Sequence, residues 1–189
     1  VRRKVGLVFQ YPEYQLFEET VAKDVAFGPK NLGLDAEEID KRVRDAIKIV
    51  GLDYDEIADK SPFELSGGQK RRVAIAGVVA MDPKILILDE PTAGLDPTAH
   101  KEIISMIESI RKKLGIIIIF VSHNMADVAA LSDKVLVVNN AKIAAEGTPG
   151  EVFSRVNFLR DIGLDVPPAV EIMKALESRI DGFTSNALT

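Results

Sequence analysis

The sequence predicts an α/β fold with a parallel sheet at its core. Two short apolar runs, Ile85–Leu88 and Ile116–Val121, have the composition of buried strands, and a helical pattern lies between them. Strands that alternate with helices in this way are typical of a parallel sheet with crossover connections. Between residues 11 and 80 the apolar spacing is helical instead, which predicts a separate helical region.

The composition limits the classes of protein that fit. With 189 residues the chain can bury a sizeable core and form one or two domains. Its formal charge of −5 argues against a nucleic-acid partner, and the basic cluster at 70–72 is interpreted as a solvated face. The absence of cysteine excludes disulfides and thiolate metal sites. No apolar run approaches the roughly 20 residues of a membrane-spanning helix, so we expect a soluble chain that reaches a membrane only through a partner.

The chain begins with a predicted strand and a short predicted helix. Val5–Phe9 has strand character, and Gln10 follows it directly. Residues 20–27 favour a helix, which we expect Gly28-Pro29 to end because this dipeptide is a strong helix breaker.

Two longer helices carry clear start and stop signals. Asp35 can cap a helix over 35–50, and Gly51 suits the position after its end. Asp96 can cap a second helix, which has proline at its first position and Gly115 after its last turn. One face of this second helix is apolar and comprises Ile103, Ile107, Ile110 and Leu114.

The segment at 65–69, Leu-Ser-Gly-Gly-Gln, begins another helix and contains an unusual pair of glycines. Ser66 and Gln69 have the spacing of a capping box, in which each side chain binds a backbone N–H left unpaired at the helix start. Gly67 and Gly68 each cost about 1 kcal/mol in helix propensity relative to alanine, so a cap alone does not explain them. They leave backbone N–H groups open to a phosphate at the positive end of the helix dipole. The alternative is an ordinary capped helix.

Polar residues follow two of the predicted strands. The strand at 85–88 ends in two adjacent carboxylates, Asp89 and Glu90. Ile116–Val121 is predicted to be a central strand buried on both faces, and it leads to His123. Because open α/β sheets bind ligands at the carboxyl ends of their strands, we expect these three polar residues to lie at that edge.

The last third of the chain predicts a hairpin and two helices. Residues 134–146 are typical of a β-hairpin with its turn at Asn139-Asn140. Thr148 and Glu151 form a second capping box with proline at the first helical position. Pro167-Pro168 opens a final amphipathic helix, whose stripe we expect to pack on the chain's own core, with a dimer contact as the alternative. That stripe comprises Val170, Met173, Leu176 and Ile180.

Five of these motifs, in chain order and spacing, resemble those of the nucleotide-binding subunits of ATP-binding-cassette (ABC) proteins. The segment at 65–69 resembles their signature motif, and 85–90 resembles their Walker B strand with its catalytic glutamate. Gly94-Leu95-Asp96 resembles the D-loop, while Gln10 and His123 match the Q-loop glutamine and the switch histidine. The resemblance covers nearly the whole chain. It implies a P-loop NTPase-like (ABC ATPase) parallel sheet core, incomplete here, with an inserted helical subdomain.

The resemblance implies a role in ATP hydrolysis for each motif. Asp89 would hold Mg²⁺ through water, and Glu90 would polarise the attacking water as the catalytic residue. His123 would donate a hydrogen bond to the γ-phosphate, and Gln10 would reach the metal and the water. Asp96 would contact the opposite protomer, because two subunits of this family enclose ATP between them. The signature residues would close over the γ-phosphate of ATP held by that other chain, and they are Ser66, Gly67, Gly68 and Gln69.

One motif of the family is missing. No Gly-Lys pair occurs in the 189 residues, so the phosphate loop G-x-x-x-x-G-K-[ST] is absent. We therefore expect a chain that has lost its N-terminal part and that binds and hydrolyses ATP poorly on its own. The interpretation divides it into the end of the N-terminal part of the core (1–10), a helical subdomain (11–80), the α/β core (81–150) and a C-terminal helical extension (151–189).

Several segments resemble one branch of the family, the ATPase subunits of energy-coupling-factor importers of vitamins or metal ions such as cobalt. They are residues 9–17, 24–29 and 66–76, and the tail around 159–168 agrees. This resemblance implies a second ATPase subunit, a transmembrane coupling subunit and, indirectly, a substrate-binding membrane protein as partners. It also implies a peripheral position on the cytoplasmic face of the cell membrane, without nucleic acid.

Two alternatives remain open at this point. A chromosome-maintenance or DNA-repair ATPase also has a signature motif and a Walker B strand, but it would carry long heptad repeats between Gln10 and Leu65, and this chain has none. The other alternative is a non-enzymatic piece that acts only through its signature face and dimer surface. The absent phosphate loop supports it, and ATP binding by the isolated chain would separate the two cases.

Overall fold

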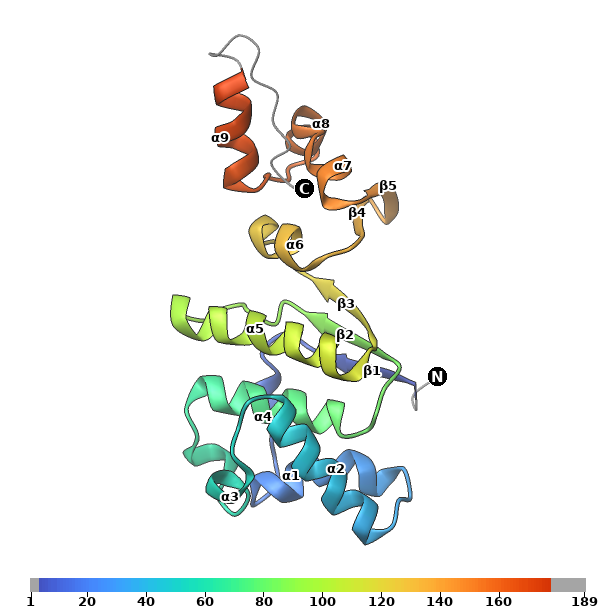
Figure 1. The fold of residues 1–189 in the computed structure, drawn as a ribbon, viewed down its shortest axis with the longest axis vertical. Coiled ribbons are helices and arrows are strands. Elements are labelled where there is room, and N and C mark those ends of the chain that lie inside the picture. Colours follow the sequence, from blue (N-terminus) through green and yellow to red (C-terminus); the bar gives the residue numbers. More distant parts are fainter. Residues whose placement is uncertain (1–3, 178–189) are drawn as a thin grey trace. The chain divides into compact units, whose positions relative to one another are not determined.

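The computed structural model describes residues 4–177 and divides them into two compact units, one up to Val121 and one from Ser122 (Figure 1). The first contains β1 (Val5–Val8), η1 (Pro12–Gln15), α1 (Val21–Asn31), α2 (Ala36–Ile49), α3 (Tyr54–Ile57), η2 (Pro62–Glu64), α4 (Gly67–Val79), β2 (Ile85–Asp89), α5 (Pro97–Leu114) and β3 (Ile117–Val121). The second contains α6 (Met125–Leu131), β4 (Val135–Asn139), β5 (Lys142–Gly147), α7 (Pro149–Phe153), α8 (Val156–Asp161) and α9 (Pro168–Glu177). No helix in these described segments has both the length and the hydrophobicity to cross a membrane.

The strands of the first unit form a parallel sheet in the order β1–β2–β3. Leu7 lies beside Ile87, and Ile87 lies beside Ile119, so these three side chains share one face. The opposite face packs into the core of the unit, where its most buried residues are Val8, Leu86 and Leu88. The predicted α/β fold with a parallel sheet is therefore confirmed.

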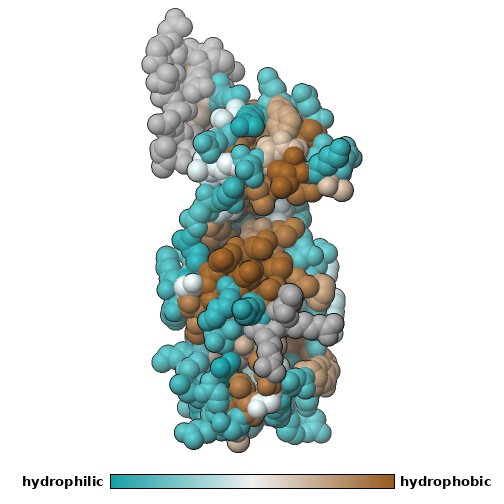
Figure 2. Space-filling model, turned by 90° about the vertical axis from the view of Figure 1, so that its right-hand side faces the viewer, coloured by the Kyte–Doolittle hydropathy of each residue, from teal (hydrophilic) through white to brown (hydrophobic). Residues whose placement is uncertain are grey.

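The other face of the sheet is hydrophobic and largely exposed (Figure 2). The prediction that Ile116–Val121 forms a central strand buried on both faces is wrong. The observed strand, β3, stands at the end of the strand order, and Ile117 and Val121 are 63% and 47% exposed. The reason is that the described helices of the first unit pack on one face of the sheet. Every second side chain of β3 points to the other face, where no described helix of this unit covers it.

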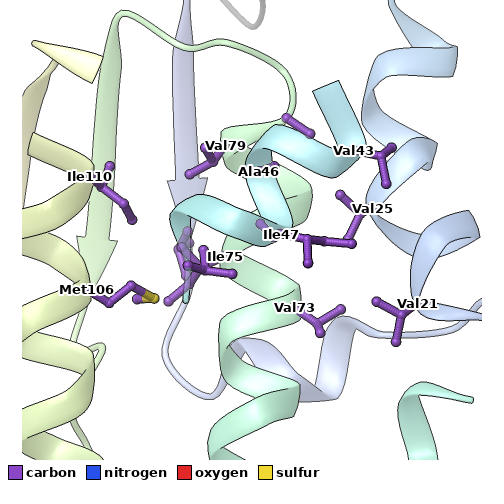
Figure 3. Close-up of a cluster of buried hydrophobic side chains, with 14 of the residues drawn as sticks. Val21, Val25, Val43, Ala46, Ile47, Val73, Ile75, Val79, Met106 and Ile110 are labelled. Carbon is purple, nitrogen blue, oxygen red and sulfur yellow. The ribbon is translucent and has the colours of Figure 1, made fainter. Parts of the chain in front are cut away.

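Helices α1, α2 and α4 form a helical region around one apolar core (Figure 3). Val25 of α1, Ile47 of α2 and Val73 of α4 point toward one another and are fully buried. Met106 and Ile110 of α5 extend the same cluster toward the sheet. One continuous core therefore holds the helical region against the strands.

Helix α1 continues through the dipeptide that was expected to end it. The helix runs to Asn31 with Pro29 inside its last turn, so the predicted break at Gly28-Pro29 is wrong. The packing explains this: Pro29 is buried, and a Cβ atom on Gly28 would be 2.6 Å from Cγ of Met81, just after α4, and 3.3 Å from the carbonyl oxygen of Gly77 in α4. Tertiary packing thus outweighs the local breaking tendency.

The boundaries of the longer helices follow the signals read from the sequence. Asp35 accepts a hydrogen bond from the backbone N–H of Glu38 and begins α2, and Asp96 accepts two such bonds and begins α5. Gly51 and Gly115 have φ angles of 75° and 60°, the left-handed conformation that commonly ends a helix. Both predicted helices are confirmed.

In the second unit, β4 and β5 form an antiparallel hairpin. The hairpin is confirmed, but its turn residues are Asn140 and Ala141, whose φ angles are both positive, one position later than predicted. Helices α7 and α8 pack against the hairpin, and the core consists of residues such as Val135, Val137, Ala145, Val152, Phe153 and Leu159.

The C-terminal helix α9 begins at Pro168, as predicted. Val170 is buried in the core of the second unit, which agrees with packing on the chain's own core. Helix α8 gives no clear signal in the sequence and was not predicted. Ile180, the last residue of the predicted stripe, lies outside the described residues.

Candidate functional site

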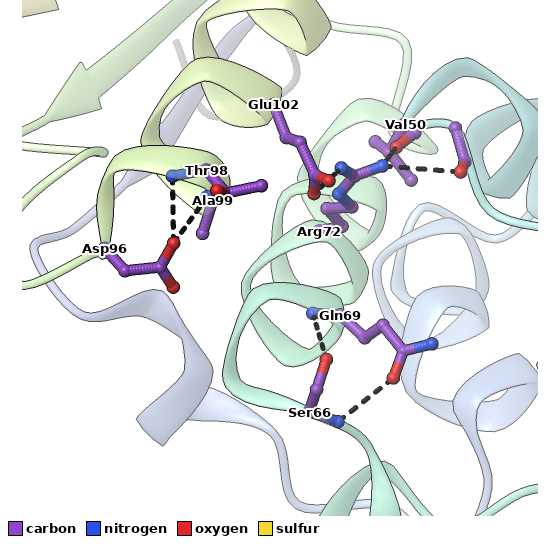
Figure 4. Close-up of polar contacts among 9 residues, drawn as sticks. Val50, Ser66, Gln69, Arg72, Asp96, Thr98, Ala99 and Glu102 are labelled. Carbon is purple, nitrogen blue, oxygen red and sulfur yellow. Dashed lines mark hydrogen bonds and ion pairs between the residues drawn. The ribbon is translucent and has the colours of Figure 1, made fainter.

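The start of α4 forms a capping box between Ser66 and Gln69 (Figure 4), and its first two residues are glycines. The backbone N–H of Ser66 donates to Oε1 of Gln69 at 3.0 Å, and the backbone N–H of Gln69 donates to Oγ of Ser66 at 3.3 Å. Apart from the adjacent residues and the nearby backbone of α4 itself, no described heavy atom lies within 4 Å of the position that a Cβ would take on Gly67 or Gly68. The first turn contains no acidic residue, so the positive end of this helix dipole is accessible to an anion.

The same helix start lines a hollow of about 810 Å³ in the first unit. The hollow brings together the predicted signature residues and the predicted D-loop, although about 25 residues of chain separate them. Its lining includes Ser66, Gly67, Gly68, Gln69, Gly94, Leu95 and Asp96. The structure therefore gathers two of the five predicted motifs around one concave surface.

Asp96 has the capping role that the sequence predicts, beside the contact that the family resemblance implies. Its Oδ1 accepts hydrogen bonds from the backbone N–H groups of Thr98 at 2.9 Å and Ala99 at 3.1 Å, which caps α5 (Figure 4). The cap fixes the carboxylate beside the hollow. Its contact with an opposite protomer stays a prediction.

Asp89 and Glu90 lie at the carboxyl end of the middle strand, β2. Asp89 pairs in register with Val121, on the exposed face of the sheet. Glu90 has a φ of 47°, and its backbone N–H donates to the carbonyl of Val121 at 2.9 Å. A non-glycine residue rarely adopts this left-handed conformation, and such strained positions are concentrated at functional sites.

Gln10 follows β1, the neighbour of β2, and is exposed. Because the strands are parallel, Gln10 and the two carboxylates leave the sheet at the same edge. His123 follows β3, but it belongs to the second unit, so its approach to Glu90 stays a prediction.

The described residues hold no group of three or more His, Cys, Asp or Glu side chains suited to a metal ion. Mg²⁺ at phosphate sites usually keeps several waters and takes only one or two protein carboxylates. Asp89 alone, half-buried at a strand end, fits that chemistry.

The interpretation of residues 70–72 as a solvated face is wrong for Arg71, which is 1% exposed. The side chain forms an ion pair with Glu13 and donates to the carbonyls of Pro91 and Ala93. The helical spacing contains the signal that was missed: Arg71, Ile75 and Val79 follow each other at intervals of four and share the buried face of α4.

Known proteins resemble this chain over its full length. A sequence profile described as "ABC transporter" matches residues 1–93. The energy-coupling factor transporter ATP-binding protein EcfA2 of Clostridium tetani is 57% identical over 189 residues, which are 100% of this chain and 66% of that protein. EcfA2 of Caldanaerobacter subterraneus subsp. tengcongensis is 60% identical over 179 residues, which are 95% of this chain and 62% of that protein.

A solved structure is also similar. CbiO1 from Clostridium perfringens, described as part of the ABC transporter complex cbiONQ, is 43% identical with a TM-score of 0.75. The match covers 92% of this chain and 68% of that one. The chain thus spans 62% to 66% of the length of the two EcfA2 proteins.

Proposed function

The chain belongs to the ABC transporter family, in its group of energy-coupling factor ATP-binding proteins, and from this premise we propose that it serves an ATPase that powers an importer. The hollow at the start of α4 is the observation that carries the proposal. Open backbone N–H groups at a helix start, beside a second motif of the family, suit the phosphates of a nucleotide. The transported substrates would be vitamins or metal ions such as cobalt.

The residues at the strand ends would carry out hydrolysis. Glu90 would accept the proton of the attacking water, and His123 would donate a hydrogen bond to the γ-phosphate. Asp89 would hold Mg²⁺ through water, with Gln10 reaching the same centre, and the ion would neutralise phosphate charge when bound. Support comes from the position of Asp89, Glu90 and Gln10 at one edge of the sheet.

The signature residues Ser66–Gln69 would bind ATP held by a second ATPase subunit. The chain contains no Gly-Lys pair, so the lysine that contacts the β- and γ-phosphates has no counterpart within residues 1–189. We expect these residues alone to bind ATP poorly. ATP binding and turnover should therefore be measured on the natural protein that contains these residues.

A transmembrane coupling subunit would dock near Gln10, and a separate membrane protein would select the substrate. The surface after Gln10 supports this, because Tyr14 is 84% exposed, and Phe17 and Phe27 form an exposed edge-to-face pair with ring centroids 4.9 Å apart. Exposed aromatic clusters mark protein interaction sites. The subunit would then lie on the cytoplasmic face of the membrane.

The decisive experiment measures ATP binding, ATP turnover and import by the natural protein with its partner subunits in vesicles. We expect Glu90→Gln to lower turnover by about 100-fold or more while ATP still binds, because the proton acceptor is lost. Glu37→Gln, at an exposed site on α2, is the matched control and should keep full activity.

Two outcomes would count against the proposal. Equal turnover of Glu90→Gln and the unchanged protein would remove Glu90 from catalysis. Absence of ATP binding by the natural protein would favour the alternative, a non-enzymatic protein that acts through its signature face. A DNA-dependent rise in turnover would favour a DNA-repair ATPase, although the segment between Gln10 and Leu65 forms short packed helices rather than a coiled coil.

A further inference from the structure

Arg71 joins three segments of the first unit through one buried guanidinium. Its Nε and Nη2 atoms donate to the two carboxylate oxygens of Glu13 at 3.0 and 2.8 Å. Its Nη1 atom donates to the carbonyl oxygens of Pro91 and Ala93, both at 2.9 Å. Glu13 lies 58 residues before Arg71, and Ala93 lies 22 residues after it. The side chain therefore ties α4 to the segment after Gln10 and to the segment after Glu90.

Each of the two tied segments contains a strained turn beside a proposed catalytic residue. Tyr11, which follows Gln10, has a φ of 56°, and its carbonyl accepts from the N–H of Tyr14 at 3.2 Å. Glu90 has a φ of 47°, and its carbonyl accepts from the N–H of Ala93 at 3.1 Å. Such conformations persist only where the surrounding structure holds them.

The two segments also contact each other. A Cβ atom on Gly94 would lie 3.4 Å from Cε1 of Tyr11, so the tyrosine ring packs against the glycine backbone. The guanidinium of Arg71 lies 5.8 Å from the centroid of the same ring. Both turns therefore have Arg71 as a common neighbour.

Only arginine suits this position. The planar fork presents its donors in fixed directions, so it can bind a carboxylate with two hydrogen bonds and two carbonyls at once. Lysine has the charge but lacks the fork, and its single nitrogen cannot satisfy all four acceptors together.

We propose that Arg71 is a positioning residue that holds Gln10 and Glu90 in place relative to the signature helix α4. The inference rests on the proposed ATPase function, because it concerns the same catalytic residues. A shift of α4 when its N-terminus binds a nucleotide would then reach both turns through one side chain. Hydrolysis would depend on the arrangement of α4, rather than on Glu90 alone.

Amide hydrogen exchange on the natural protein tests the structural part. Arg71→Gln should speed exchange at both turns, at the N–H groups of Tyr14 and Ala93, because it removes the bonds that hold them. Arg72→Gln is the matched control: Arg72 is the next residue, and it pairs with Glu102 and the carbonyls of Val50 and Gly51 instead. Its removal should leave both turns unchanged.

Kinetics separates positioning from simple stabilisation. Arg71→Gln should lower kcat by about 100-fold, the usual cost of a misplaced catalytic group, and leave the KM for ATP within about threefold. Arg71→Lys should recover little of the loss. The double variant Arg71→Met with Glu13→Gln removes both charges, so no unpaired buried charge remains, and the protein should be more stable than Arg71→Gln, although the carbonyls of Pro91 and Ala93 still lose their donor.

The double variant gives the sharpest result. Positioning predicts that thermal stability recovers in part while kcat stays low, whereas a purely structural role predicts that kcat recovers with it. Recovery of kcat, or unchanged exchange at either turn in Arg71→Gln, would overturn the inference. If the unchanged protein does not hydrolyse ATP, the proposed function fails, and the exchange experiment still decides whether Arg71 holds the two turns.

Discussion

The capping boxes at the starts of α4 and α7 have the same geometry and different charges. At the start of α4, the N–H of Ser66 donates to Oε1 of Gln69 at 3.0 Å. At the start of α7, the N–H of Thr148 donates to Oε2 of Glu151 at 2.8 Å. The reciprocal bond, from the N–H of the fourth residue to the hydroxyl of the first, measures 3.3 Å in both boxes.

The charge of the fourth residue in each box, Gln69 or Glu151, decides whether the helix start can bind an external anion. Glu151 places a carboxylate at the positive end of the α7 dipole, so the chain's own side chain neutralises that partial charge. Gln69 is neutral and caps α4 equally well, and no acidic residue stands in that first turn. A neutral cap therefore secures a helix and leaves its dipole and its open glycines to an external phosphate.

The largest effect is expected from giving α4 the charge of α7. Gln69→Glu preserves the capping box, since glutamate is a favourable residue at this position, so thermal stability should stay the same or rise. The added charge should repel a nucleotide phosphate and weaken ATP-dependent association of the two subunits about tenfold or more. Analytical ultracentrifugation with and without ATP measures this. Unchanged association would mean that no phosphate approaches α4.

The glycines offer the second test. Gly68→Ala meets open space and should raise the free energy of unfolding by about 0.5 kcal/mol through better helix propensity. The same methyl group should obstruct a phosphate and lower ATP turnover several-fold. Denaturant titration and turnover are measured together. Gly150→Ala, also in open space at the start of α7, is the control and should leave turnover unchanged.

Removing the hydroxyl group of each cap should lower the stability of both helices by a similar amount. Its effect on ATP-dependent association should be smaller than that of the preceding variants. Ser66→Ala and Thr148→Ala should each cost about 1 kcal/mol of local helix stability. Only Ser66→Ala should also reduce ATP-dependent association, because α4, and not α7, is the helix that we propose to bind a nucleotide phosphate. Hydrogen exchange of each helix measures stability separately. Equal loss of association in both variants would contradict the functional difference between the boxes.

The smallest expected effect is a pH dependence of the stability that the α7 capping box contributes, with no such dependence at the α4 box. The backbone N–H and hydroxyl of Thr148 hold the pKa of Glu151 below its ordinary value of 4.5. The ionised side chain thus adds stability above pH 4.5, and this stability is lost as the pH falls through the lowered pKa.

Thermal unfolding of Glu151→Gln and of the unchanged protein tests this. The variant should be slightly less stable at pH 7, and the difference should vanish in strong acid. Gln69 does not titrate, so the effect of Ser66→Ala should not change over the same range. A Glu151→Gln difference that persists at low pH would show that shape, rather than charge, makes the α7 cap.

Interactions between neighbours in the chain could be predicted well. Both capping boxes, the caps at Asp35 and Asp96 and the parallel strands appear where the sequence indicates them. Their signals depend on residues at most four positions apart or on a simple period, so the sequence contains them in full. The roles of the signature and strand-end residues come from the resemblance to a family, and they stay predictions.

Contacts between distant segments could not be predicted. Pro29 stays inside α1 because Gly28 meets Met81, and Arg71 is buried because Glu13 and the carbonyls of Pro91 and Ala93 satisfy its charge. Helical spacing places Arg71 on the buried face of α4, but it does not identify the distant partners that a charge needs at 1% exposure.

The sequence by itself therefore determined the family of this protein, its parallel strands and most of its helix caps, because these depend on local chemistry and on motif spacing. The tertiary structure alone decided which face of β3 is covered, how far α1 extends and what Arg71 joins. These features depend on which surfaces meet when the chain folds. The free energy of each contact depends on both of the residues that form it, and these lie far apart in the sequence.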